Sequence, residues 1–199
     1  MTVLGNGLDG GKQDEDALIV REAELSTLRR LGGSEENMLN VQGNLASTYY
    51  ELGQLDKALS MERDVYSGRL RLHGEQHVGT CLAAENYAIS LVDLQRYAEA
   101  KSVLSKMIPV VQCALGESNA TTLKMRWLYA RVLYEDDGAT LDDLREAVTT
   151  LEETERTARR VLGGAHPYTT GIEYTLQHVR AARDAHNTPP PLGAAQKIH

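Results

Sequence analysis

The chain has 199 residues, of which 42% are hydrophobic and 25% are charged, and its formal net charge is −7. This length and composition suit one ordinary domain or a short array of repeats. The negative charge argues against broad electrostatic binding to nucleic-acid phosphates or anionic membranes, so we expect no nucleic acid and no membrane as a partner.

The cysteines and the N-terminal residues bear on cellular location. Cys81 and Cys113 are the only two cysteines; they form no disulfide framework and fit a reducing compartment. The first twenty residues lack the cationic start and long apolar run of a signal peptide. No segment has the apolar length that spans a bilayer. We therefore expect a soluble, cytoplasmic protein.

The spacing of apolar residues predicts helices throughout the chain. Residues 1–12 are rich in glycine, and we expect them to be disordered. Apolar residues then recur at helical spacing, and no alternating strand pattern occurs. The helices are expected at about residues 14–31, 38–52, 55–72, 80–94, 97–115, 121–134, 141–162 and 168–186. Residues 13–186 thus form the ordered array, and residues 187–199 form a flexible tail with three consecutive prolines.

These helices repeat in pairs. Two sets of small residues keep a step of 42 residues: Gly32, Gly74 and Gly116, and Ala46, Ala88 and Ala130. Three later residues stand 47 residues beyond their counterparts: Leu144, Ala147 and Gly163. One insertion within residues 135–143 explains all three displacements, so the sequence predicts an array of two-helix repeats. We expect a long loop between Glu135 and Leu141, followed by a helix with a capping box of Thr140 and Asp143.

The turn between the helices and the linker between the pairs resemble those of a known repeat family. The turn Gly53-Gln54-Leu55-Asp56-Lys57-Ala58 is typical of tetratricopeptide repeats, whose ordinary period is about 34 residues. A 42-residue version with an L-G-x-x-H-x-x-T linker is similar to the kinesin light chain type; residues 162–169 are the best copy. Nothing here supports the heptad coiled coil of kinesin light chains. The resemblance implies an all-α superhelix, or solenoid, of helix pairs; the alternative is a HEAT-like array, whose period is about 40–47 residues.

The resemblance also implies a binding surface. Such solenoids bind partners in a concave groove lined by the first helix of each pair. In the family, an asparagine of that helix bonds the backbone of an extended peptide, because an amide can both donate and accept. The matching positions are Asn44 and Asn86, then Leu128, then a position near Thr175. The same face carries Asn40, Leu82 and Lys124 one turn earlier, and Ser47, Ile89 and Arg131 one turn later.

Charged residues suggest what the groove could select. Lys124 and Arg131 could meet an acidic peptide, and Arg69 matches a basic residue that some family members place at the groove wall. Simpler alternatives stay open: an asparagine in a helix can bond a neighbouring helix and fix the repeat geometry, and cations on helices are commonly just solvated. Trp127 is expected to pack between repeats.

The sequence contains no catalytic motif. We find no G-x-S-x-G, phosphate-binding glycine loop or H-E-x-x-H. His73, His77 and Cys81 would share a face of one helix, but Gly74 and Gly79 argue against a continuous helix there. The acidic residues 135–143 lack the order of a calcium-binding loop. We therefore expect no metal, no cofactor and no enzymatic activity.

The predicted function is that of a non-enzymatic adaptor or scaffold that binds a protein or peptide in its concave groove. The alternative is a structural subunit whose groove is permanently occupied within a larger assembly. The N-terminal pair lacks its first helix, which keeps this alternative open because an uncapped end of a solenoid exposes apolar surface.

Overall fold

The computed structural model describes residues 3–187, and side chains from residue 15 to residue 186. Within this range the chain forms eight helices and no strands, which confirms the all-α prediction. The helices are α1 (Val3–Leu31), α2 (Glu35–Glu51), α3 (Leu55–His73), α4 (Val78–Asp93), α5 (Tyr97–Leu115), α6 (Ala120–Glu135), α7 (Leu141–Leu162) and α8 (Pro167–Asn187). From α2 onward, each begins and ends within three residues of its expected bounds.

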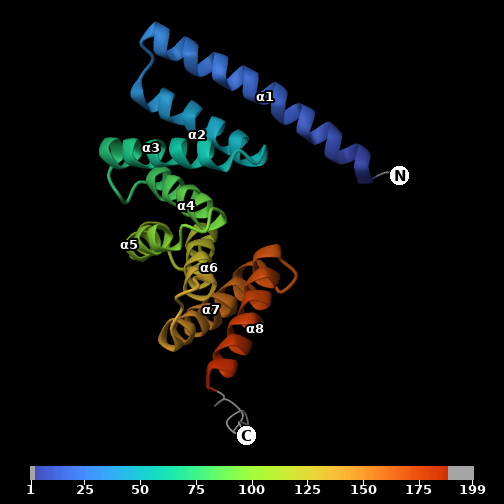
Figure 1. Ribbon diagram of the computed structural model, residues 1–199. Coiled ribbons are helices and arrows are strands. Elements are labelled where there is room, and N and C mark those ends of the chain that lie inside the picture. The colour runs from blue at the N-terminus through green and yellow to red at the C-terminus, as the bar shows by residue number, and fades with distance from the viewer. Residues whose placement is uncertain (1–2, 188–199) are drawn as a thin grey trace, which may run out of the picture.

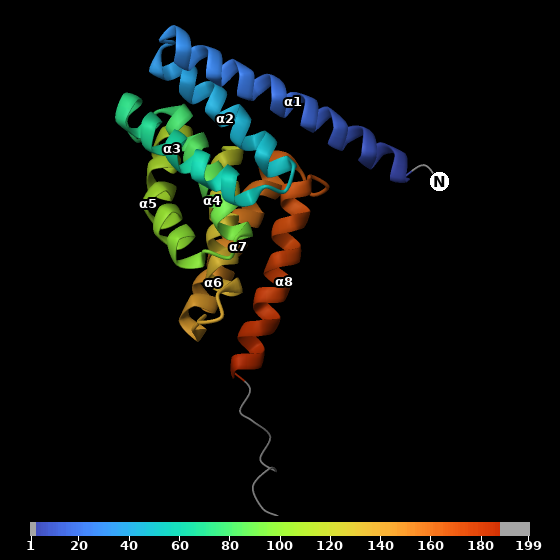
Figure 2. The same ribbon diagram turned by 45° about the horizontal axis from the view of Figure 1, so that its top comes forward.

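α1 differs from the prediction. It begins at Val3, inside the glycine-rich segment that the sequence predicts to be disordered, and has 29 residues. Its N-terminal half extends beyond the other helices (Figures 1 and 2). Its C-terminal half packs on α2, where Leu25 joins Val41, Leu45 and Tyr49 in a buried cluster. The proline-containing tail lies outside the described residues from residue 188 onward.

The helices form a solenoid that runs from α1 at one end to α8 at the other (Figure 1). Each helix packs on the next one in the chain, and in addition α4 packs on α6 and α6 packs on α8. The first helices of successive pairs are therefore neighbours on one side of the array. This is the arrangement expected for stacked helix pairs, and it makes that side the candidate binding side.

The hydrophobic core is divided into three clusters along the solenoid. One cluster joins α1, α2 and α3, a second joins α3 to α6, and a third joins α6, α7 and α8. Trp127 packs against the third cluster, and its Nε1–H donates to Thr175 Oγ1 of α8 at 2.9 Å. The prediction that Trp127 packs between repeats is confirmed.

The linker histidine cap the helix that follows it. His77 Nδ1 accepts a hydrogen bond from the Gly79 N–H at 3.1 Å, and His166 Nδ1 accepts one from the Tyr168 N–H at 3.1 Å. Asn119 does the same for α6 through Oδ1 at 2.9 Å. These residues share one repeat position, so the L-G-x-x-H pattern marks a helix N-cap, where a side-chain acceptor satisfies a free backbone N–H.

The insertion predicted within residues 135–143 is divided between a loop and a helix. The loop between α6 and α7 has five residues, whereas the corresponding loops after α2 and α4 have three. α7 has 22 residues, whereas α3 and α5 have 19 each. The capping box of Thr140 and Asp143 is present and begins the lengthened helix.

The turns after α2 and α4 differ at one residue with a positive φ. Gly53 has φ +71°, and the equivalent Gln95 has φ +57°. A residue with a Cβ loses about 1–2 kcal/mol in this left-handed conformation. We expect Gln95→Gly to raise the free energy of unfolding by up to about 1 kcal/mol, since added freedom of the unfolded chain offsets part of the gain. Urea denaturation would measure it.

Gly53→Gln is the matched control. A Cβ at Gly53 would meet no atom within 4 Å, so only the backbone conformation is at issue. This variant should lose about as much stability as Gln95→Gly gains. Equal stabilities for the wild type and both variants would contradict the prediction.

Candidate binding groove

Two adjoining cavities lie along α2 and α4. The larger, of about 350 Å³, is bounded by α2, α3 and α4, and its lining includes Asn40, Asn44, Ser47, Arg69, Leu82 and Asn86. The smaller, of about 190 Å³, also reaches α6, and its lining includes Ser47, Tyr50, Glu62, Asn86, Ile89 and Lys124. Because Ser47 and Asn86 line both cavities, the two form one groove, which we call the α2–α4 groove.

The α2–α4 groove brings together most of the residues that the sequence places on one face. Of the six predicted binding residues, five line it: Asn40, Asn44, Arg69, Asn86 and Lys124. Ser47, Leu82 and Ile89, which share their face in the sequence, line it too. Arg131 lines neither cavity and forms an ion pair with Glu135 at 2.8 Å.

The two asparagines at the repeated position are available to a ligand. Asn44 and Asn86 are both exposed. Neither side-chain amide hydrogen-bonds another described residue; Asn44 takes part only through its backbone carbonyl, which accepts from Arg21 Nη1 at 2.8 Å. This disfavours the alternative in which the two asparagines tie neighbouring helices together.

The three predicted cations differ in how far they are already paired. Lys124 Nζ lies 3.1 Å from Glu85 Oε1, and Arg131 is paired with Glu135. Arg69 donates from Nη2 to Asn40 Oδ1 at 2.8 Å, and its buried Nε has no hydrogen-bond partner. The Arg69 guanidinium lies against Gly79, where a Cβ would collide with Nη1. Arg69 is therefore the cation with an unused donor at the groove.

Glu62 lines the smaller cavity and was not singled out from the sequence. Its residue surface is 6% exposed, yet no cation lies within ion-pair distance among the described residues. Its Oε2 and the Oγ of buried Ser90 both lack a hydrogen-bond partner. Burial raises the pKa of Glu62 to about 7; the nearby Ser90 hydroxyl acts in the opposite direction, and the charge of Asp93 adds to the rise.

A comparison of repeat positions could have identified Glu62. The equivalent residues in the next two second helices are Leu104 and Leu151, both fully buried. The equivalents of Ser90 are Val132 and Val179, which are also fully buried. A polar pair between α3 and α4 thus replaces an apolar pair that recurs between α5 and α6 and between α7 and α8.

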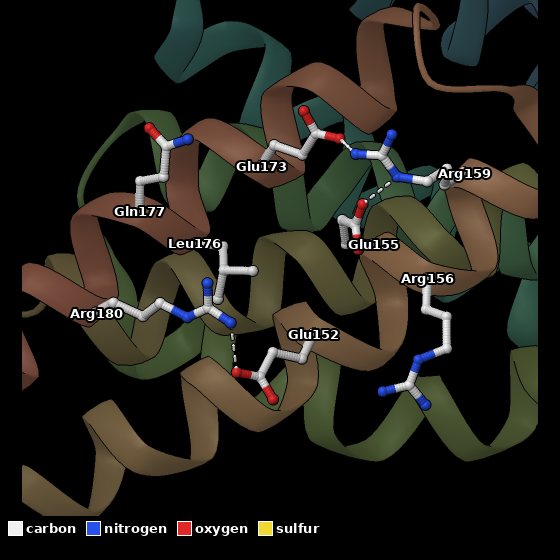
Figure 3. A pocket seen from close by; sticks show the side chains of 8 residues that line it. All are labelled: Glu152, Glu155, Arg156, Arg159, Glu173, Leu176, Gln177 and Arg180. Carbon is white, nitrogen blue, oxygen red and sulfur yellow. Dashed lines mark hydrogen bonds and ion pairs between the residues drawn. The ribbon is translucent and has the colours of Figure 1, made fainter.

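A third cavity, of about 570 Å³, lies between α7 and α8 at the C-terminal end of the array (Figure 3). Its charged residues mostly pair with one another: Arg159 lies between Glu155 and Glu173, and Arg180 contacts Glu152 at 2.7 Å. The equivalent cavity between α5 and α6 is bounded by Thr150 of α7. The larger cavity is therefore the open last position of the solenoid, with the polar surface that such ends carry.

Metal and membrane sites were sought across the described residues. In that part of the chain, no group of three or more His, Cys, Asp or Glu side chains is placed to hold a metal ion. The His73 and His77 rings stack with centroids 4.3 Å apart. Among the same residues, no helix combines the length and apolarity needed to cross a membrane.

The chain is similar to known tetratricopeptide proteins. Residues 37–112 match the family model of the tetratricopeptide repeat. No curated protein matches the chain. The nearly identical TPR-like repeats of a Podosopora anserina protein described as a kinesin light chain have a TM-score of 0.73 at 18% identity, over 92% of this chain and 85% of that one; a variant of that structure gives 0.74. BtubC (BKLC) from P. vanneervenii has a TM-score of 0.58 at 14% identity, over 94% and 81%. At these identities the likeness shows a shared fold.

Proposed function

We propose that this chain, a solenoid whose residues 37–112 are tetratricopeptide repeats, is an adaptor that binds an extended peptide segment of a partner protein. The observation that carries the proposal is the pair of unbonded, exposed amides of Asn44 and Asn86 on consecutive first helices. Each amide can donate to a backbone carbonyl and accept from a backbone N–H of the ligand. The cavities between the amides leave room for alternate side chains.

Charge selection in this proposal begins at Arg69. Its unpartnered Nε and its exposed neighbour Asn40 favour an acidic group of the ligand at that end of the groove. Lys124 and Arg131 would support binding only by sharing their charge with Glu85 and Glu135. Breaking an existing pair costs free energy, so these two cations contribute less than Arg69.

We include no catalysis in the proposal. The serine that lines both cavities, Ser47, donates its hydroxyl to the Gly43 carbonyl at 3.2 Å, and no general base activates it. Cys81 and Cys113 are both free thiols, which supports placing the protein in the reducing cytoplasm.

The proposed function can be tested with the double variant Asn44→Ala and Asn86→Ala. Peptides would first be selected from a displayed random library on the wild-type chain. We expect the double variant to bind them about 5- to 150-fold more weakly, because each neutral hydrogen bond contributes about 0.5–1.5 kcal/mol. Its melting temperature should be unchanged or slightly higher, since alanine is the better helix former. Fluorescence anisotropy and thermal denaturation would measure both.

Asn37→Ala provides the matched control, because Asn37 is exposed on the same helix outside the lining of the groove. It should bind the selected peptides like the wild type. A double variant that melts early while still binding its peptides would show that the asparagines hold the repeats together, and would end the proposal.

A structural subunit of a larger assembly is a second candidate function. It is supported by Ile19 and Val20 of α1, whose surfaces are 66% and 65% exposed. In this case the isolated chain should self-associate in sedimentation experiments, and Ile19→Lys should prevent it.

A further inference from the structure

We propose that the smaller cavity of the α2–α4 groove is a subsite for a cationic group, a guanidinium or ammonium supplied by a basic side chain of the bound peptide. Glu62 is the residue that would receive it. This inference deepens the proposed function and rests on it for the identity of the ligand as a peptide. It assigns the groove a polarity, with an acidic ligand group at Arg69 and a basic one at Glu62.

The first argument is the replacement of an apolar pair by a polar one. Glu62 and Ser90 occupy positions where the other two helix-pair interfaces place a buried leucine against a buried valine. An interface with only a packing role is served by those apolar residues, because a buried polar atom without a partner is destabilising. Here two such atoms remain, Glu62 Oε2 and Ser90 Oγ. A ligand cation would give the carboxylate the partner that the described part of the chain does not supply.

The second argument is that the cavity opens where Glu62 lies. The side chain of Glu62 lines a volume of about 190 Å³ together with Tyr50, Asn86 and Ile89. Ile89 offers apolar surface to the stem of a basic side chain, and the Asn86 amide oxygen can accept from its head. Charge-assisted hydrogen bonds of this kind are stronger than neutral ones.

The third argument is the charge of the surroundings on each neighbouring helix. α2 contributes Glu51 to the cavity lining, and its Tyr50 hydroxyl donates to Asp93 of α4. α6 contributes Lys124, which is held by Glu85, and further along it Arg131 is held by Glu135. The nearby cations are thus already paired with other carboxylates, and Glu62 is not.

Proton binding should compete with the cation. Because the pKa of Glu62 lies at about 7, the carboxylate is mostly protonated at pH 6 and mostly ionised at pH 8. A cation binds the ionised form, so its affinity should rise by about tenfold between these two pH values.

The subsite can be tested on the full chain by NMR titration with n-propylguanidinium, with butyrate as the anionic comparison. At pH 8 we expect n-propylguanidinium to shift the Ile89 methyl and Asn86 side-chain amide signals, and butyrate to leave them in place. Glu62→Gln, which keeps the shape and removes the charge, should weaken binding by roughly tenfold or more. It should also abolish the pH dependence.

Asp64→Asn is the control, because it removes an exposed carboxylate from the same helix. It should bind n-propylguanidinium like the wild type. Equal binding by the wild type and Glu62→Gln, or no shift at Ile89 and Asn86, would overturn the cation subsite. In that case, peptides that still depend on Asn44 and Asn86 would leave the proposed function standing. Shifts without any selected peptide would retain the subsite and remove the peptide-binding function.

Discussion

A Glu62→Leu variant is expected to be more stable than the wild type, and its advantage should be larger at pH 8 than at pH 5 by about 2–4 kcal/mol. Leucine is the residue that the next two repeats bury at this position, as Leu104 and Leu151. The pH dependence follows from the rise in the pKa of Glu62 from 4.5 to about 7 on folding. Below pH 4.5 the carboxyl is neutral in both states. As the pH rises through 7, the folded chain must hold a buried charge, and stability is lost.

Urea denaturation at the two pH values would measure this difference. Glu62→Gln is the second variant to compare, because it removes the charge without adding an apolar side chain. It should share the change in pH dependence with Glu62→Leu but gain less stability. If all three chains lost stability in parallel between pH 5 and pH 8, the carboxyl would not be the buried group that the structure shows.

Gly171→Ala is expected to lower the free energy of unfolding by about 1–3 kcal/mol, although alanine ordinarily stabilises a helix. A Cβ at Gly171 of α8 would lie 2.5 Å from Trp127 Cη2 and 2.8 Å from Cζ2 of α6. The indole cannot easily move away, because its Nε1–H is held by Thr175 and its ring packs on the C-terminal core cluster. The variant must therefore separate α6 from α8 or break the Trp127 hydrogen bond.

Gly43→Ala is the matched control within a helix. A Cβ there would meet only Val65 Cγ1, at 3.9 Å, which is an ordinary contact. This variant should therefore be stabilised by roughly 0.5–1 kcal/mol through helix propensity. Thermal denaturation of both variants would measure the contrast. A gain in stability at Gly171 equal to that at Gly43 would contradict the close approach of α6 and α8.

The helices from α2 onward could be predicted from the sequence because each repeat confirms the next. A helix bound that is ambiguous in one unit is supported by the same step in another, as the displacement of Leu144 and Gly163 shows. The start of α1 has no such support. Glycine disfavours helix by about 1 kcal/mol per residue, and the segment 1–12 has no counterpart elsewhere in the chain.

The groove was predictable in part. Helical periodicity places Asn40, Asn44 and Ser47 on one face, and the repeat step places Leu82, Asn86 and Ile89 on the equivalent face of the next pair. The pairing of Lys124 with Glu85 was not predictable, because these residues are 39 positions apart and the contact depends on how α4 and α6 pack. Glu62 could have been found by comparing repeats at one position, whereas the apolar spacing within α3 alone hides a single carboxylate among core residues.

The division of the core into three clusters has a consequence for how the protein can change. In a single compact core, an ill-matched buried pair would weaken every element that shares it. Here the Glu62–Ser90 contact lies between α3 and α4, while α7 and α8 are held by a separate cluster that includes Leu151 and Val179. Substitutions can accumulate at one helix-pair interface while distant interfaces keep the chain folded. Such an array can acquire a new partner one repeat at a time, with each interface evolving largely independently of those that are not its neighbours.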